Sequence, residues 1–158
     1  MNKNEELINR FYTAFQQKDY NTMQNCYAEN AQFNDAVFKN LSAHQVKSMW
    51  EMLLKKSTDL HVDFKNIQAD EFTGSSDWIA TYTFSATHNK VVNKVHANFE
   101  FAGGKIVKHT DHFDFYKWAS QAFGFKGRLL GWTDFMKRKV QETAAKNLEN
   151  FMKNKEEK

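Results

Sequence analysis

Residues 99–124 read FEFAGGKIVKHTDHFDFYKWASQAFG, and the fold prediction starts from this stretch. Two alternating apolar runs flank a Gly-Gly pair, which is the pattern of a β-hairpin. Side chains alternate with period two along a strand, so Val107, His109, Asp111 and Phe113 are predicted to share one face. An imidazole and a carboxylate between apolar neighbours are typical of a small-molecule pocket with a polar centre. The sequence therefore predicts a pocket that contains titratable groups.

The chain before this hairpin changes from a helical to a strand-like period near residue 61. Apolar residues at helical spacing predict helices over 4–17, 20–28 and 43–56, the last with Ser42 as its N-cap. Strand-like runs follow, separated by turn residues, over 60–69, 78–88, 91–102 and 105–118. Helices followed by strands within one domain predict an α+β fold, with three N-terminal helices packed on one face of a curved antiparallel sheet.

A helical extension is predicted at the C-terminus. The segment 123–132 combines glycine with Phe, Leu and Trp, and these side chains must be covered by the mouth of a pocket or by a partner subunit. A last helix with a moderately apolar stripe is predicted over 133–153. We expect 1–122 to form the domain and 123–158 to form a loop and an amphipathic helix packed on it.

Composition limits the class of protein. The 158 residues include fifteen Phe, five Tyr and four Trp, which is enough apolar area for one well-packed domain. Cys26 is the only cysteine, so an intrachain disulfide is impossible, and its helical spacing indicates a buried thiol. The N-terminus lacks a signal-peptide pattern, and no apolar run has the length of a membrane span. These features predict a cytoplasmic protein without a membrane partner.

The formal net charge of +3 is concentrated at the C-terminus. Residues 137–158 contain seven Lys or Arg and four Glu, so 7 − 4 = +3 and the remainder sums to zero. Both signs of charge alternate along the predicted helix, which indicates a solvated face. A nucleic-acid partner is therefore not expected.

Two motifs resemble a known group of proteins. Residues 9–35, NRFYTAFQQKDYNTMQNCYAENAQFND, and residues 103–118, GGKIVKHTDHFDFYKW, occur in the order and spacing of the SnoaL-like group in the nuclear transport factor 2-like superfamily. That group includes polyketide cyclases and relatives of ketosteroid isomerase. The resemblance covers about 4–120 and implies a cone-like sheet closed on three helices. It also implies that pairing through the outer face of the sheet could give a homodimer.

The resemblance assigns roles to positions in this chain. The general base of the isomerases corresponds to Asp35. Their oxyanion hole needs a tyrosine and a protonated aspartate, and the corresponding places hold Phe11 and, approximately, Ala97. Isomerase chemistry with that oxyanion hole is therefore not expected. Similarity to the cyclases places the emphasis on Asp111, within the run GKIVKHTD at 104–111.

Asp35, His109 and Asp111 are the candidate catalytic residues, suited to general acid–base chemistry. Burial raises the pKa of a carboxyl group and lowers that of an imidazole, which brings both toward neutrality. The alternative interpretation is structural: His109 and Asp111 bond only each other or the backbone, and Asp35 bonds its own turn. The expected ligand-binding walls are aromatic: Tyr12, Trp50, Trp78, Tyr82, Phe84, Phe99 and Phe113.

No cofactor and no metal are predicted. The chain contains no glycine-rich phosphate loop, and alternation places His112 on the opposite face from His109. A metal would need His109, Asp111 and a third ligand such as His61 or Asp35. This requirement makes a metal site the weaker interpretation.

Three functions remain open from the sequence. The first is a small isomerase, cyclase or hydrolase acting on a hydrophobic molecule through Asp111 and His109, assisted by Asp35. The second is a non-catalytic module that binds a hydrophobic ligand in the same cone. The third is a purely structural dimerisation domain, with the polar outer-face residues Lys94, His96, Asn98 and Glu100 at a moderately hydrated interface.

Overall fold

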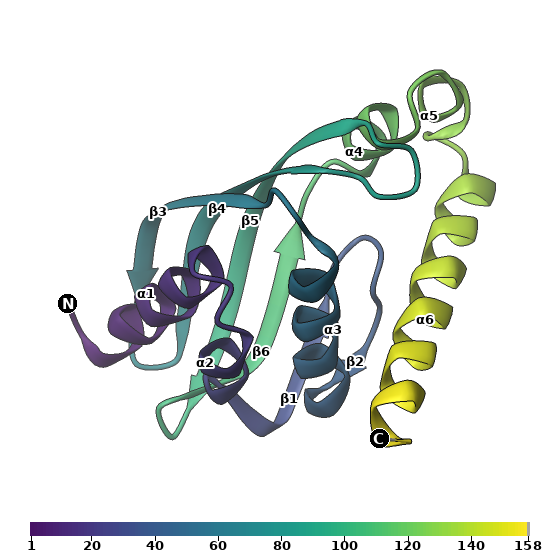
Figure 1. The fold of residues 1–158 in the computed structure, drawn as a ribbon. Helices are drawn as coiled ribbons and strands as arrows, with labels where there is room; N and C mark the ends of the chain where they lie inside the picture. Colours follow the sequence, from purple (N-terminus) through teal and green to yellow (C-terminus); the bar gives the residue numbers. More distant parts are fainter. Residues whose placement is uncertain (158) are drawn as a thin grey trace.

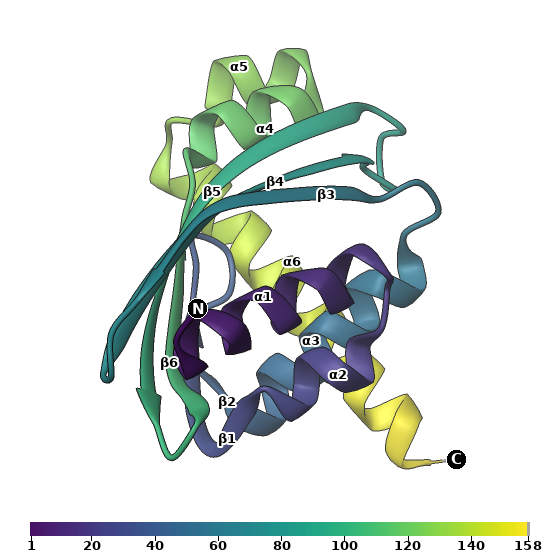
Figure 2. The same ribbon diagram turned by 90° about the vertical axis from the view of Figure 1, so that its left-hand side faces the viewer.

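Six strands form one curved sheet in the order β2-β1-β6-β5-β4-β3 in the computed structural model, which describes residues 1–157. The strands are β1 (Tyr27–Asn34), β2 (Leu41–Ser42), β3 (His61–Ala69), β4 (Thr73–Thr83), β5 (Lys90–Ala102) and β6 (Lys105–His112). The helices are α1 (Lys3–Gln16), α2 (Tyr20–Asn25), α3 (Ala43–Lys56), α4 (Phe115–Phe123), α5 (Phe125–Leu130) and α6 (Asp134–Glu156). Helices α1–α3 cover the concave side of the sheet (Figures 1 and 2), which confirms the predicted α+β fold.

Local sequence signals explain the N-terminal helices. Capping boxes begin α1, at Asn2 and Glu5, and α3, at Ser42 and Gln45. In both helices the side chain of the N-cap residue, Asn2 or Ser42, accepts a hydrogen bond from the backbone N–H of the residue three positions later. The predicted bounds and N-cap of α3 are confirmed. Both helices bury one apolar face against the sheet.

A bulge in the β5–β6 hairpin changes the predicted alternation. Phe101 pairs with Ile106, but the preceding pair is Glu100 with Lys108, so Val107 is an additional residue. Ile106 is therefore buried and Val107 is only half-buried, which corrects the prediction that Val107 lies on the pocket face. The alternation resumes beyond the bulge and places the next odd-numbered side chains inside.

The sheet is antiparallel except at one junction. Strand β1 pairs in parallel with β6, with Phe33 beside His109. A parallel pair needs a long crossover, and here the whole of α3 and β3–β5 connects the two strands. The second helix ends at Asn25, earlier than predicted, and Tyr27 belongs to the strand.

The C-terminal region differs from the prediction between 115 and 130. The chain forms the two short helices α4 and α5 there, where the sequence suggested the end of a strand and a loop. Asp114 is the N-cap of α4 and accepts from the backbone N–H of Lys117. Helix α4 lies against β5, where Gln121 bonds the backbone of Val92, and α5 lies above α4 in the view of Figure 2.

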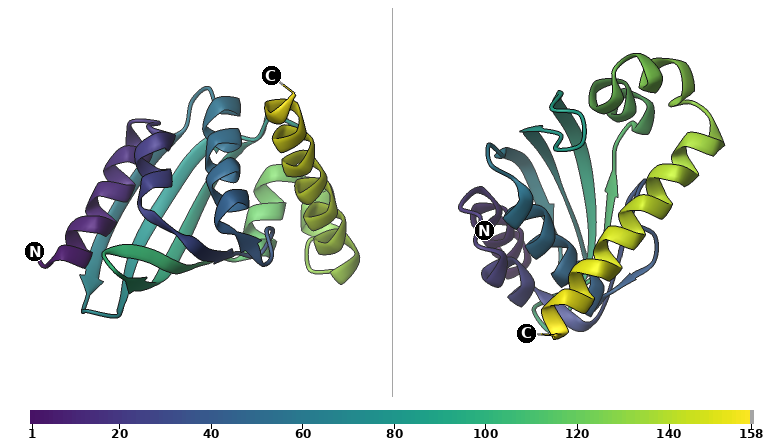
Figure 3. Two further views of the ribbon diagram at one scale, coloured as in Figure 1. Left: turned by 90° about the horizontal axis from the view of Figure 1, so that it is seen from below. Right: turned by 45° about the vertical axis from the view of Figure 1, so that its right-hand side comes forward.

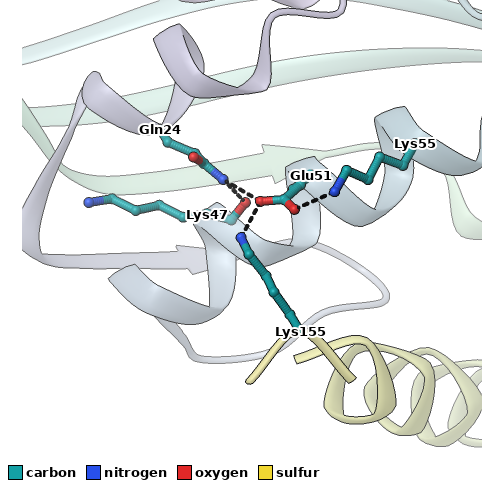
Figure 4. Close-up of polar contacts among 5 residues, drawn as sticks. All are labelled: Gln24, Lys47, Glu51, Lys55 and Lys155. Carbon is teal, nitrogen blue, oxygen red and sulfur yellow. Dashed lines mark hydrogen bonds and ion pairs between the residues drawn. The ribbon is translucent and has the colours of Figure 1, made fainter. Parts of the chain in front are cut away.

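Helix α6 packs along α3 (Figures 1 and 3). Leu148 is its buried residue. The buried carboxylate of Glu51 on α3 accepts from Lys155 of α6, from Lys55 at 2.8 Å and from Gln24 of α2 at 3.4 Å (Figure 4). This cluster fixes the C-terminal end of α6 to the domain. Among residues 1–157, no helix combines the length and the apolar character needed to cross a bilayer.

Candidate functional site

His109 lies on β6 on the enclosed side of the sheet and has no accessible surface. Its Nε2 atom lies 2.8 Å from Oδ1 of Asp111, and its Nδ1 atom lies 2.8 Å from the hydroxyl of Tyr27. Both ring nitrogens therefore have protein partners. A ligand could reach an imidazole nitrogen only by displacing one of these partners.

The hydrogen bonds around His109 have one self-consistent direction. The indole N–H of Trp50 donates to the hydroxyl oxygen of Tyr27 at 2.9 Å. Burial raises the pKa of Tyr27 well above its usual value, so the phenol keeps its proton and donates it to Nδ1 of His109. An imidazole that accepts at Nδ1 carries its proton on Nε2 and donates it to Asp111. Three side chains thus form a series of donors that ends at a carboxylate.

Asp111 accepts hydrogen bonds at one oxygen only. Trp78 donates its indole N–H to Oδ1 at 3.4 Å, and this is the atom that also accepts from His109. Oδ2 has no hydrogen-bond partner among residues 1–157, and 4% of the Asp111 surface stays accessible. The carboxylate is therefore held at one oxygen and unpaired at the other.

Aromatic rings fill the space around the imidazole. Five ring centroids lie between 4.4 and 6.4 Å from that of His109; they belong to Phe11, Tyr27, Phe33, Trp50 and Phe99. The sequence suggested a hollow around His109, but side chains occupy this volume. Asp111, rather than His109, is the member of the pair that retains accessible surface.

Asp35 follows β1. It has a feature expected of a turn residue, bonds to nearby backbone groups, and one expected of a catalytic residue, a raised pKa. Its Oδ1 accepts from the backbone N–H groups of Val37 at 2.7 Å and Phe38 at 2.6 Å, as in a turn. Burial raises the pKa of Asp35 to about 6 against the hydrogen bond from Phe38, and the negative charge of Asp111 adds to the rise. The two carboxylates are therefore close enough to influence each other.

The predicted aromatic walls divide into two groups. Tyr12, Trp50, Trp78 and Phe99 belong to the core that surrounds His109 and Asp111. Phe84 belongs to a second cluster, where its ring lies 5.5 Å from that of Trp118 on α4. Tyr82 and Phe113 are half-buried and contact both clusters.

Two buried tyrosines, Tyr27 and Tyr12, lie in the same core as His109; the sequence predicted Tyr12 as a pocket wall and gave Tyr27 no role in the site. Tyr27 was assigned to a helix, although Tyr27, Ala31 and Phe33 already show the odd-numbered alternation of a strand. Tyr12 is fully buried, and its hydroxyl has no hydrogen-bond partner within the described residues 1–157. Burial raises the pKa of Tyr12 well above its usual value, and the charge of Asp111 raises it further.

The residues considered for a metal do not come together. His61 is exposed and pairs with Asp63 at 3.3 Å, away from the core. Within residues 1–157, no three His, Cys, Asp or Glu side chains are grouped as a possible metal-ligand set. His96 and His112 lie on the outer face of the sheet, as alternation predicted.

A curved sheet that encloses helices and a polar pair defines the nuclear transport factor 2-like cone fold. The model of the SnoaL-like domain family matches residues 8–109, so the chain belongs to the SnoaL-like family. Among curated protein sequences, none matches this chain.

Solved structures share this fold at low sequence identity. An LEH-like epoxide hydrolase from M. tuberculosis is 19% identical, with a TM-score of 0.62 over 82% of this chain and 91% of the hydrolase. A polyketide cyclase, so described provisionally, from Xanthomonas campestris pv. campestris is 16% identical, with a TM-score of 0.64 over 76% and 96%. A protein with a ketosteroid isomerase-like fold from Catenulispora acidiphila is 10% identical, with a TM-score of 0.64 over 75% and 92%. These similarities show the fold alone.

Proposed function

We propose that this SnoaL-like protein is an enzyme that moves a proton on a small hydrophobic substrate, as an isomerase, cyclase or hydrolase. The observation that carries the proposal is the unpaired Oδ2 of Asp111. The ring N–H groups of His109 and Trp78 hold the other oxygen of the same carboxylate. A carboxylate positioned in this way in a water-poor site suits a general base.

The proposed mechanism divides the work among three residues. Oδ2 of Asp111 takes a proton from a carbon acid or from an attacking water. His109 positions Asp111 and stabilises its negative charge through the Nε2 hydrogen bond. Asp35, with its pKa raised to about 6, is partly protonated near neutrality and returns a proton to the product. Two carboxylates in different environments can act as general base and general acid in one reaction.

The substrate is proposed to approach through the half-buried residues between the two aromatic clusters. Tyr82 and Phe113 border this approach, and the buried rings of Tyr12 and Trp78 lie further inside. The unpartnered hydroxyl of Tyr12 supplies a donor for a polar atom of the substrate. The apolar surroundings favour a hydrophobic or aromatic molecule.

A non-catalytic binding module is the second candidate. It is supported by the filled space around His109 and by Phe11 and Ala97 at the places of the isomerase oxyanion donors. In this case Asp111 would hold a polar group of the ligand without transferring a proton. Ligand binding would then depend on Asp111, but no product would form.

A panel of hydrophobic epoxides and β-dicarbonyl compounds separates the two candidates. Binding is measured by thermal shift and turnover by mass spectrometry for wild type, Asp111→Asn and His109→Ala. The enzyme proposal expects turnover that Asp111→Asn abolishes, and the binding proposal expects affinity without turnover. If both variants bind every ligand as wild type does, the site is assigned to the wrong residues.

The proposal also includes a cytoplasmic location and a homodimer formed through the outer face of the sheet. The exposed outer-face residues of β5, Lys94, His96, Asn98 and Glu100, are polar. Size-exclusion chromatography with light scattering measures the oligomeric state. Charge reversal at Lys94 and Glu100 tests the face.

A further inference from the structure

Large apolar side chains are exposed at the junction of α5 and α6. We call this surface the apolar corner. Its five residues and their accessible fractions are Phe125 (73%), Leu129 (54%), Leu130 (46%), Trp132 (73%) and Phe135 (64%). The sequence required a cover for these residues, and no part of the chain within residues 1–157 provides it. Five large apolar side chains exposed within eleven residues are the kind of feature that marks an interaction site.

The packing of α5 on α4 fixes which side chains point outward. A Cβ atom at Gly127 would lie only 1.9 Å from the carbonyl oxygen of Ala119, so this face of α5 touches α4 directly. Gly131, one turn later, meets the Cβ of Ala119 in the same way. Phe125 and Leu129 are two residues from Gly127, about half a helical turn around the axis. They therefore point away from α4.

The segment that carries the apolar corner is rich in positive charge. Residues 115–139 contain six basic side chains and one acidic, so 6 − 1 = +5, against +3 for the whole chain. The cations are Lys117, Lys126, Arg128, Lys137, Arg138 and Lys139. None of these six forms a salt bridge with another residue in the range 1–157. Phe125 and Leu129 share the face of α5 opposite Gly127. Lys126 and Arg128 lie on either side of that face, each about 100° around the helix axis from Gly127.

We propose that the apolar corner docks the protein on an anionic membrane surface. Phe, Leu and Trp side chains enter the boundary between headgroups and acyl chains, and Lys and Arg pair with anionic headgroups. This proposal departs from the sequence-based expectation of no membrane partner, which rested on the lack of a membrane-spanning segment. Docking in the interface does not require a helix that crosses the bilayer. A second copy of this chain fits the surface less well, because two corners of charge +5 repel each other.

The position of the corner permits this contact. Helices α4 and α5 lie at one end of the sheet, away from α1 and α2 (Figures 1 and 3). A flat surface can therefore meet α5 without touching the helices that cover the site. The corner also lies outside residues 8–109, which the SnoaL-like family model matches.

Trp132 provides a direct measurement of docking. It is 73% accessible, whereas Trp50, Trp78 and Trp118 are at most 8% accessible, so a change in tryptophan emission on docking reports mainly on Trp132. Vesicles of phosphatidylcholine with about a third phosphatidylglycerol should shift its emission to the blue and co-sediment the protein about tenfold more tightly than neutral vesicles do. High salt should weaken the binding.

Matched variants separate the corner from other exposed groups. Phe125→Ser should weaken vesicle binding about tenfold and abolish the blue shift, whereas Phe72→Ser, at an exposed Phe in the β3–β4 turn, should leave both unchanged. Lys126→Glu/Arg128→Glu should weaken binding similarly, and Lys3→Glu/Lys65→Glu should have little effect. The four charged positions, Lys3, Lys65, Lys126 and Arg128, are all exposed. Circular dichroism checks that each variant is folded.

Three results would overturn the proposal. The first is wild-type protein that fails to bind anionic vesicles. The second is a Phe125→Ser variant that binds them as wild type does. The third is a wild-type dimer that Phe125→Ser converts into a monomer, with no vesicle binding, because the corner would then join two copies. Binding to polyglutamate but not to vesicles would indicate an acidic protein instead.

Discussion

Glu51 and Asp111 are both deeply buried carboxylates, 2% and 4% accessible, but their partners differ. Glu51 accepts at both oxygens, from two lysines and a glutamine (Figure 4). Burial opposes its ionisation, yet the bonds from Lys155 and Lys55 hold its pKa below the usual value. Asp111 accepts at one oxygen, from the ring N–H groups of His109 and Trp78.

The difference separates a carboxylate that connects three helices from one that the protein holds at a single oxygen. Every strong acceptor position of Glu51 is used to connect α2, α3 and α6. Asp111 is held at Oδ1 by His109 and Trp78, but its Oδ2 has no hydrogen-bond partner among residues 1–157. Burial alone therefore does not separate the two carboxylates; they differ in how much of their hydrogen-bonding capacity the protein uses.

The largest expected effect concerns Asp111 itself. Asp111→Asn keeps an oxygen that can accept from His109 and Trp78 but removes the basic carboxylate. We expect kcat/KM for a substrate identified in the panel to fall about 100-fold or more, with little change in Tm. Glu51→Gln is the control and should leave kcat/KM unchanged. An equal loss of activity in the two variants would remove the distinction between these carboxylates.

Tyr27→Phe tests the series of donors behind Asp111. The change leaves the indole N–H of Trp50 and Nδ1 of His109 without a partner in a dry environment. We expect the free energy of unfolding to fall by about 2–3 kcal/mol in urea denaturation. Tyr116→Phe, at an exposed hydroxyl that donates to the carbonyl of Arg128, should change it by less than about 0.5 kcal/mol. Equal costs would show that the buried hydroxyl has no special role.

The pH dependence of the free energy of unfolding tests Asp35, a third carboxylate, through the variant Asp35→Asn. The folded pKa of Asp35 is about 6, above the usual 3.8, so between these values the folded state binds more protons than the unfolded state. The stability of wild type relative to Asp35→Asn should therefore decrease as pH rises from 4 to 6. The expected decrease is about 2 kcal/mol, less than the full value for a fully buried group. Urea midpoints across this range measure it, and parallel pH curves would contradict it.

Glu51→Gln should lower the free energy of unfolding by only about 1 kcal/mol, because Lys55 and Lys155 are about half exposed and return to water. The loss should shrink as pH falls through the lowered pKa of Glu51, where wild type also loses the charge. Hydrogen exchange should show faster opening at the C-terminal end of α6. Unchanged exchange in α6 would show that its apolar contacts, including Leu148, suffice to hold it.

Local patterns were sufficient to predict α3 and the inward direction of His109 and Asp111. A capping residue and a period of two act over a few residues, so the sequence displays them directly. The same reasoning misplaced Val107, because the bulge depends on how β6 pairs with β5. It also predicted only a turn of helix after Asp114, where α4 lies, and missed α5. Gly127 and Gly131 suggested a loop there but instead lie at the contact with Ala119 of α4.

The chemistry of the candidate site was less accessible from sequence. Tyr27 meets His109 only because β1 lies beside β6, and no local pattern encodes that pairing. The predicted aromatic walls were assigned to one pocket, whereas Phe84 packs on Trp118 in a separate cluster. Which rings share a cluster depends on the curvature of the sheet and on α4.

The parallel contact between β1 and β6 also has a consequence for biosynthesis. The bond between Tyr27 and His109 spans 82 positions, so the ribosome delivers the first of these residues long before the second. Until β6 emerges, β1 has one long edge without its neighbour and depends on the short β2 and α3 for protection. Contacts between residues so far apart in the sequence form slowly. We therefore expect the pairing of β1 with β6 around His109 to be among the last native contacts to form.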